Sequence, residues 1–143
     1  GDRLIIAGFQ AQISALSLKT QRIEWDSDHS TLRPLSSVGN TLLVTTDDGS
    51  VSGLDIRTGS QMWEVDVLRG RGVSGPLGLG KNDLAVVGDY KGLLYLIDVA
   101  SGQLVGRQKG GGGAVLGIYG SGDQDQFITL SENGALTAWS AGE

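Results

Sequence analysis

Apolar and polar residues along this chain alternate in short runs, without the spacing of a helix. β-branched and aliphatic residues form runs of about four to seven positions, each bounded by Gly, Asp, Asn or Ser. Such runs predict β-strands, and no stretch favours a helix. A tight hairpin turn needs a residue that tolerates positive φ, as Gly does, and Asn-Gly is among the strongest such signals. Hairpins are therefore predicted at Asp48-Gly49, Lys91-Gly92 and Asn133-Gly134, and second hairpins at Thr58-Gly59-Ser60 and Ser101-Gly102-Gln103.

The strand pattern repeats with a period of about 42 residues. An offset of 42 joins Pro34 to Pro76, Asn40 to Asn82, Leu42 to Leu84 and Asp47 to Asp89. One residue inserted in the next turn gives an offset of 43, which joins Gly49 to Gly92, Asp55 to Asp98 and Gly59 to Gly102. An earlier copy matches Leu16 to Leu54, Thr20 to Thr58 and Trp25 to Trp63, and a fourth begins near Phe127. A repeat of this length, built from short strands, is typical of β-propeller blades.

A short apolar segment precedes each later unit and predicts the innermost strand of a blade. The three segments are 34–38, 75–79 and 114–118. Their small residues suit strands that converge on a crowded axis, and Pro is tolerated at the start of a strand. The sequence therefore predicts an all-β fold, a partial β-propeller of four-stranded antiparallel blades. We expect one domain over residues 1–143, with repeats at approximately 1–33, 34–75, 76–113 and 114–143.

The number of repeats is too small for an ordinary closed ring. A chain of 143 residues holds about 3.4 units of 42, whereas propellers have four to eight blades. We expect the chain to be part of a longer protein, its C-terminal portion. The ends of an open arc would expose apolar faces and strand edges. Self-association, swapping or neighbouring molecules are the ways in which the isolated chain could cover them.

Composition excludes several classes of function. The 24 glycines reflect dense turns, and 39% hydrophobic residues with 19% charged residues favour a folded core. The net charge of −5 argues against nucleic-acid binding, which needs a basic surface. There is no cysteine for a disulfide, a thiolate site or a nucleophile. The sequence as given shows neither a leader peptide nor an apolar run near 18 residues.

None of the motifs that resemble catalytic or cofactor sites has the context it needs. The segment 70–75 fits GxGxxG, but residues 76–80 cannot open the required helix, so we interpret it as a loop between blades. The glycine run 110–113 lacks the Lys-Ser or Lys-Thr of a P-loop and is interpreted as a connection. No serine lies in the G-x-S-x-G motif that places the nucleophile of many hydrolases. Two groups of acidic residues could suggest a calcium loop: Asp26 and Asp28 beside His29, and Asp123 with Asp125. Neither group has enough oxygen ligands for one.

The better candidates for function are residues in exposed turns, because rigid blades present their loops for recognition. Asp47 and Asp48 occupy one hairpin tip, and Arg69 and Arg71 lie in one connection between blades. Arg is enriched at interface hot spots. We therefore predict these four residues as partner-binding candidates, and no catalytic, cofactor-binding or metal-binding residue. The three tryptophans, Trp25, Trp63 and Trp139, are predicted to recur with the repeat and to pack between blades.

One unit of the repeat carries a recognisable signature. The order of a Gly turn, an apolar strand ending in Asp, then Thr-Gly, then Trp resembles the repeat of quinoprotein-like (PQQ) propellers, carried here by Gly49, Leu54, Asp55, Thr58, Gly59 and Trp63. Within that superfamily, segment 84–109 is similar to the next-to-last blade of the BamB family of outer-membrane assembly lipoproteins. The resemblance implies an eight-bladed ring that is a non-enzymatic scaffold without a cofactor.

The same resemblance implies a cell location and partners. BamB-family lipoproteins lie at the periplasmic face of the outer membrane of Gram-negative bacteria, anchored by an N-terminal lipid. They bind the periplasmic (POTRA) domains of BamA and assist insertion of outer-membrane proteins. Two alternatives remain open: a piece of a quinone-dependent dehydrogenase, which shares the blade signature, and an unrelated propeller used for sensing or adhesion. The sequence upstream would separate them.

Overall fold

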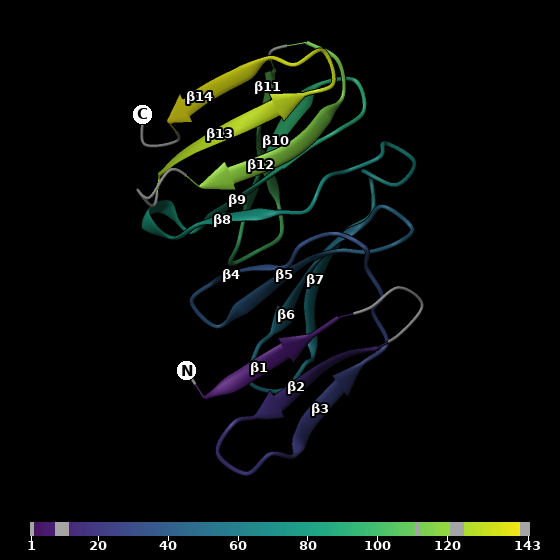
Figure 1. Ribbon diagram of the computed structural model, residues 1–143, viewed down its shortest axis with the longest axis vertical. Coiled ribbons are helices and arrows are strands. Elements are labelled where there is room, and N and C mark those ends of the chain that lie inside the picture. The colour runs from purple at the N-terminus through teal and green to yellow at the C-terminus, as the bar shows by residue number, and fades with distance from the viewer. Residues whose placement is uncertain (1, 8–11, 111, 121–124, 141–143) are drawn as a thin grey trace.

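Four antiparallel β-sheets follow one another along the chain in this computed structural model, which describes residues 2–7, 12–110, 112–120 and 125–140. Figure 1 shows the sheets stacked in chain order, with the first sheet at one end of the molecule and the last at the other. The described residues contain no α-helix, only a 3₁₀ turn at Gly80–Asn82. The predicted all-β propeller arc is confirmed.

Within the described residues, the two middle sheets have four strands and the two end sheets have three. The first sheet contains β1 (Arg3–Ile6), β2 (Ile13–Ser17) and β3 (Ile23–Ser27). The second contains β4 (Ser36–Val38), β5 (Thr41–Thr45), β6 (Val51–Asp55) and β7 (Gln61–Val65). The third contains β8 (Leu77–Leu79), β9 (Leu84–Gly88), β10 (Leu93–Asp98) and β11 (Leu104–Lys109). The last contains β12 (Val115–Gly120), β13 (Gln126–Ser131) and β14 (Leu136–Ser140).

The predicted innermost strands are confirmed as β4, β8 and β12, which form one edge of their sheets. These strands also lie next to one another across the sheets. Between β4 and β8, the backbone N–H of Gly78 donates a 2.8 Å hydrogen bond to Oγ of Ser36. A Cβ atom at Gly78 would lie 2.6 Å from Cγ2 of Val38. The inner strands can therefore converge only because this position lacks a side chain.

The hairpins have the turn geometry that the sequence predicts. Gly49, Gly92 and Gly134 have φ values of +91°, +87° and +86° between their second and third strands. Gly59 and Gly102 both have φ of +77° in the outer hairpin of their sheets. Only glycine adopts this backbone region without strain, which explains why the glycines recur in the repeat.

The structure corrects the alignment of the repeats. Thr41 pairs with Asp55 in the second sheet, and Leu84 pairs with Asp98 in the third, so Leu84 corresponds to Thr41 and not to Leu42. The extra residues lie in the turn between β8 and β9, which contains the 3₁₀ turn and Asp83 with φ of +52°. The sequence alignment placed the insertion one hairpin too late, because both turns are polar and tolerate extra residues.

Apolar side chains between adjacent sheets form the core, and two tryptophans link successive sheets in the same way. The indole of Trp25 donates to the carbonyl oxygen of Ile56 in the next sheet at 3.0 Å, and that of Trp63 donates to Val99 at 2.7 Å. Trp139 differs: its indole N–H donates a hydrogen bond within its own sheet, and its ring stacks on Phe127. The predicted packing role is confirmed for all three, but the predicted recurrence is wrong for Trp139.

Candidate partner-binding face

The four predicted partner-binding residues lie on one end of the sheets. The antiparallel order brings two kinds of connection to that end: the links between sheets and the hairpins between second and third strands. Hydrogen bonds tie them together, because Asp47 N–H donates to the Ser30 carbonyl at 3.0 Å and Tyr90 N–H donates to the Arg71 carbonyl at 2.9 Å. We call this end the loop face; it consists of residues 28–35, 46–50, 66–76 and 89–92.

Arg69 and Asp48 come from different connections and form an ion pair. Nε of Arg69 lies 3.2 Å from Oδ2 of Asp48, and its Nη2 lies 3.4 Å from Oε1 of Glu64. Hydrogen bonds from the Thr46 hydroxyl and from the Ser50 backbone and hydroxyl groups, with the charge of Arg69, lower the pKa of Asp48 to about 2, against the opposing effect of burial. Asp48 therefore stays ionised at neutral pH, and about half of each paired side chain remains exposed.

Arg71 forms a second ion pair, but this one is internal. Its Nε donates a 2.9 Å hydrogen bond to Oδ2 of Asp89, whose side chain has no exposed surface. The Tyr95 hydroxyl donates to the same oxygen at 2.9 Å, and the backbone N–H groups of Lys91 and Leu93 donate to Oδ1. Burial by itself would raise the pKa of Asp89, but these hydrogen bonds outweigh it and lower the pKa.

This arrangement separates the roles of the two arginines. Because Arg71 compensates a buried carboxylate, its main effect is to fix the connection between β7 and β8 against the β9–β10 hairpin. Arg69 keeps an exposed guanidinium beside Asp48, so it is the arginine that a partner could reach. Asp47 is exposed next to it and accepts a hydrogen bond from the Ser30 hydroxyl. The structure thus brings Asp48 and Arg69 into contact, and it leaves Arg71 in a separate cluster.

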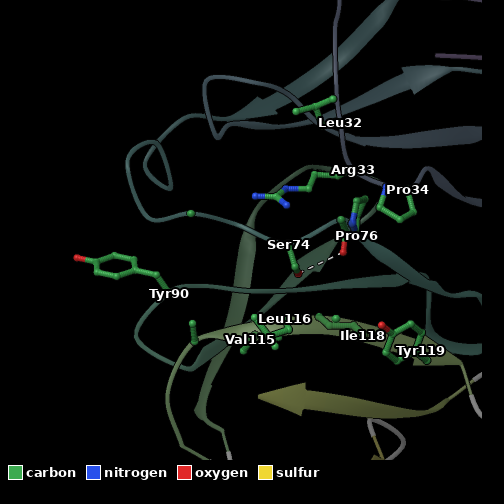
Figure 2. A pocket seen from close by; sticks show the side chains of 14 residues that line it. Leu32, Arg33, Pro34, Ser74, Pro76, Tyr90, Val115, Leu116, Ile118 and Tyr119 are labelled. Atoms are coloured by element: carbon green, nitrogen blue, oxygen red, sulfur yellow. Dashed lines mark hydrogen bonds between the residues drawn. The ribbon is translucent and has the colours of Figure 1, made fainter. Parts of the chain in front are cut away.

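The loop face also has a hollow of about 320 Å³ that the sequence analysis did not identify. Figure 2 shows the Arg33 side chain extending between Leu32 and Ser74, with Leu116 and Tyr119 of β12 along the opposite wall. Leu32 is 69% exposed, Leu116 61% and Tyr119 55%. The sequence feature that could have pointed to this hollow is Leu32, an apolar residue in an otherwise polar link between strands. Its importance depends on β12, which lies more than 80 residues later in the chain.

The remaining sequence motifs have structural roles where they are described. Segment 70–75 is a connection between sheets without a helix, as predicted. His29 contacts the Ser27 hydroxyl and the Gln61 side chain. Asp125 pairs with Lys81, whereas Asp123 and Gly111 lie outside the described residues. Within the described ranges, no three His, Cys, Asp or Glu side chains are grouped so that they could hold a metal ion. In the same part of the chain, no helix has the length and apolarity to cross a bilayer.

Comparison with known proteins gives the family. Residues 1–65 match the family model described as outer membrane protein assembly factor BamB. The outer membrane protein assembly factor BamB of Pseudomonas aeruginosa is 32% identical over 109 residues, which are 76% of this chain and 28% of that protein. The chain belongs to the BamB family. It spans less than a third of the length of this BamB relative.

Solved structures share the fold of this chain. BamB from Moraxella catarrhalis matches 97% of this chain and 41% of its own chain, with a TM-score of 0.89 and 24% identity. A computationally designed protein, Ika4, matches 99% of this chain and 87% of its own, with a TM-score of 0.80 and 20% identity. Both matches support the fold. The four-sheet arc therefore occurs within a longer BamB chain and also as nearly the whole of a shorter designed chain.

Proposed function

We propose that this chain is part of a non-enzymatic scaffold in outer-membrane protein assembly, located at the periplasmic face of the outer membrane of a Gram-negative bacterium. The observation that carries the proposal is the family match, since the relatives that define the family are named as outer membrane protein assembly factors. Its partners would be the periplasmic domains of BamA and, through them, outer-membrane proteins undergoing insertion. An N-terminal lipid on the intact protein would provide the membrane attachment.

The loop face is the surface we assign to the BamA domains. It presents an exposed ion pair between Arg69 and Asp48, exposed Asp47, and the adjacent hollow with Leu32 and Arg33. An arginine beside exposed apolar side chains is the composition of an interface hot spot, whereas the surrounding carboxylates fix charge complementarity. Arg71 stabilises this face through its ion pair with buried Asp89, so it would not itself need to contact the partner.

Binding between the intact protein that contains this arc and the purified periplasmic domains of BamA tests the proposal. Calorimetry or surface plasmon resonance should detect a complex, and Arg69→Glu should weaken it by about tenfold or more, because a charge is reversed in a buried contact. Arg57→Glu is the matched control. Arg57 is also exposed and paired with a carboxylate, Asp55, but it lies in the hairpin at the opposite end of the sheets.

Two results would contradict the proposal. If the intact protein does not bind the BamA domains, the scaffold function is wrong. If Arg57→Glu weakens binding as much as Arg69→Glu does, the loop face is not the binding surface. The enzyme alternative has its own assay, because a quinone-dependent dehydrogenase would reduce a dye when quinone and substrate are supplied. We expect no such activity from the intact protein.

A further inference from the structure

A further hollow of about 370 Å³ lies on the loop face, where the link between the first and second sheets meets the β5–β6 hairpin. Four carboxylates line it: Asp28 in that link, Asp47 and Asp48 in the hairpin, and Glu64 in β7. We call it the acidic hollow. The sheets on both sides of it belong to this chain, so the hollow lies between neighbouring sheets and not at an end of the arc.

Arg69 neutralises only one side of the acidic hollow. Its guanidinium lies 3.2 Å from Asp48 and 3.4 Å from Glu64. Asp28 and Asp47 are exposed, and each accepts a hydrogen bond from a neutral side chain. Neither of them forms an ion pair with a Lys or Arg in the part of the chain that the structure describes. The side of the hollow at Asp28 and Asp47 therefore keeps its negative charge uncompensated.

A buried hydroxyl group without a partner adjoins the same hollow. Ser52 has no exposed surface, and among the described residues its Oγ has no hydrogen-bond partner. Ser52 pairs with Glu64 in the register of β6 and β7, so the two side chains lie on the same face of the second sheet. Ser50, two positions earlier on that face, lines the hollow with Glu64. Because buried polar groups are nearly always hydrogen-bonded, this hydroxyl points to a donor group that enters the hollow.

The spacing of the carboxylates selects the kind of cation that fits. Within the described ranges, no three His, Cys, Asp or Glu side chains are grouped closely enough to hold a metal ion. A Lys or Arg side chain does not need such a grouping, because it carries several N–H donors and can bind carboxylate and hydroxyl oxygens that lie apart. The acidic hollow is therefore suited to an organic cation on a long side chain.

We propose that the acidic hollow receives one Lys or Arg side chain of the protein partner, held by the carboxylates of Asp28 and Asp47. This inference rests on the proposed function, since it names the group that the BamA domains present to the loop face. Arg69 remains on Asp48 and Glu64 and is free to meet an acceptor of the partner. A cation site directly beside a fixed guanidinium gives the face a pattern of charge that a partner matches in only one register.

Titration with a single cationic residue tests the hollow without BamA. The probes are N-acetyl-arginine amide and N-acetyl-lysine amide, with N-acetyl-glutamine amide as the neutral control, added at constant ionic strength to the intact protein that contains this arc. The backbone N–H signals of Asp47 and Ser50 in its NMR spectrum should shift with a Kd of about 10 mM. Asp28→Asn combined with Asp47→Asn should weaken binding about threefold or more, because both charges are removed.

The probes also identify the side chain. The cationic probe that binds more tightly shows whether the site prefers the guanidinium of Arg or the ammonium of Lys. If neither cationic probe shifts these signals, or if the neutral control shifts them equally, the inference is wrong. Asparagine keeps an acceptor oxygen for the neighbouring hydrogen bonds, so the double variant should fold. Far-UV circular dichroism checks that its sheets persist.

Affinity for the purified periplasmic domains of BamA tests the same hollow in the complex. Asp28→Asn combined with Asp47→Asn should weaken binding by about tenfold and make it less dependent on salt. Asp66→Asn is the matched control, because Asp66 is an exposed carboxylate of the loop face that does not line the hollow. It should change the affinity by less than about twofold.

The results separate this inference from the proposed function. If the intact protein binds the BamA domains and Asp66→Asn weakens binding as much as the double variant does, the scaffold function stands and the cation site is wrong. If the BamA domains do not bind at all, the proposed function is wrong, and the titration with the arginine and lysine probes still decides whether the hollow binds a cationic side chain.

Discussion

Nε of Arg71 donates a 2.9 Å hydrogen bond to Oδ2 of Asp89, a carboxylate that has no exposed surface. Four donors surround this carboxylate, two from side chains and two from backbone N–H groups. Tyr95 also lies beneath the guanidinium of Arg71, which is 6.0 Å from the ring centre. A buried charge is tolerated only when its hydrogen bonds are satisfied. This cluster therefore holds the connection between the second and third sheets at the loop face.

Replacing Asp89 should be among the more destabilising single changes in the chain. Asp89→Ala leaves the Tyr95 hydroxyl and two backbone N–H groups without their acceptor, so we expect a loss of about 3 kcal/mol in the free energy of unfolding. Asp89→Asn keeps one acceptor oxygen and should cost less. Urea denaturation of both variants measures the difference, and equal losses would show that the hydrogen bonds do not stabilise the fold.

Acid should destabilise the protein through its carboxylates. The pKa values of Asp89 and Asp48 are lowered in the folded protein, to about 2 for Asp48, whereas an unfolded chain titrates near its ordinary value of about 3.9. The unfolded state therefore binds more protons as the pH falls. Their stabilisation is complete above pH of about 4 and decreases toward the folded pKa values.

Urea denaturation between neutral pH and about pH 3 measures this effect. The free energy of unfolding should fall with pH, and Asp48→Asn should reduce the slope because one of the titrating carboxylates is removed. Ser37→Asn, at an exposed position of β4 without a carboxylate, is the control. A slope that Asp48→Asn does not change would show that this carboxylate has the same pKa in both states.

Gly102 should be more sensitive to substitution than its positive φ alone would make it. Both Gly102 and Gly134 have positive φ, at +77° and +86°, so alanine is strained at either site. A Cβ at Gly102 would also lie 2.6 Å from the Trp63 ring, whereas one at Gly134 meets nothing within 4 Å. We expect Gly102→Ala to cost about 2 kcal/mol more than Gly134→Ala in the free energy of unfolding.

A double-mutant cycle identifies the cause of that difference. In the background of Trp63→Ala, Gly102→Ala should cost about the same as Gly134→Ala, because the indole that it would contact is gone. Thermal unfolding of the four variants provides the comparison. If the extra cost persists without the indole, it does not come from the packing of Trp63 on the turn.

Gly78 should tolerate alanine poorly for a different reason. Its backbone does not have positive φ, but a Cβ would lie 2.6 Å from Val38 and 2.7 Å from the Ser37 carbonyl oxygen. Gly78→Ala should therefore separate β4 from β8 and cost about 2 kcal/mol in the free energy of unfolding. Gly120→Ala is the control, since its nearest neighbour is 3.9 Å away. Equal effects in denaturation would contradict convergence of the inner strands.

Local sequence determined the strands, the hairpins and the repeated sheet. Alternation of apolar residues and the glycines at positive φ depend on neighbours in the chain, so Gly49, Gly92 and Gly134 could be placed in turns without a structure. Candidate residues such as Asp48 and Arg69 were recognisable as turn residues. Their pairing was not, because they lie in different connections that only the sheet order brings together.

The tertiary structure decided what depends on contacts between sheets. It showed that Thr41, and not Leu42, corresponds to Leu84, since register is fixed by cross-strand pairing and not by the spacing of polar turns. It also placed Arg71 on buried Asp89, and it gave Trp139 a role unlike that of Trp63. The spacing of residues along the sequence determines the repeat period of this fold. Which residues meet is determined by packing between the sheets, because those contacts join residues that are distant along the chain.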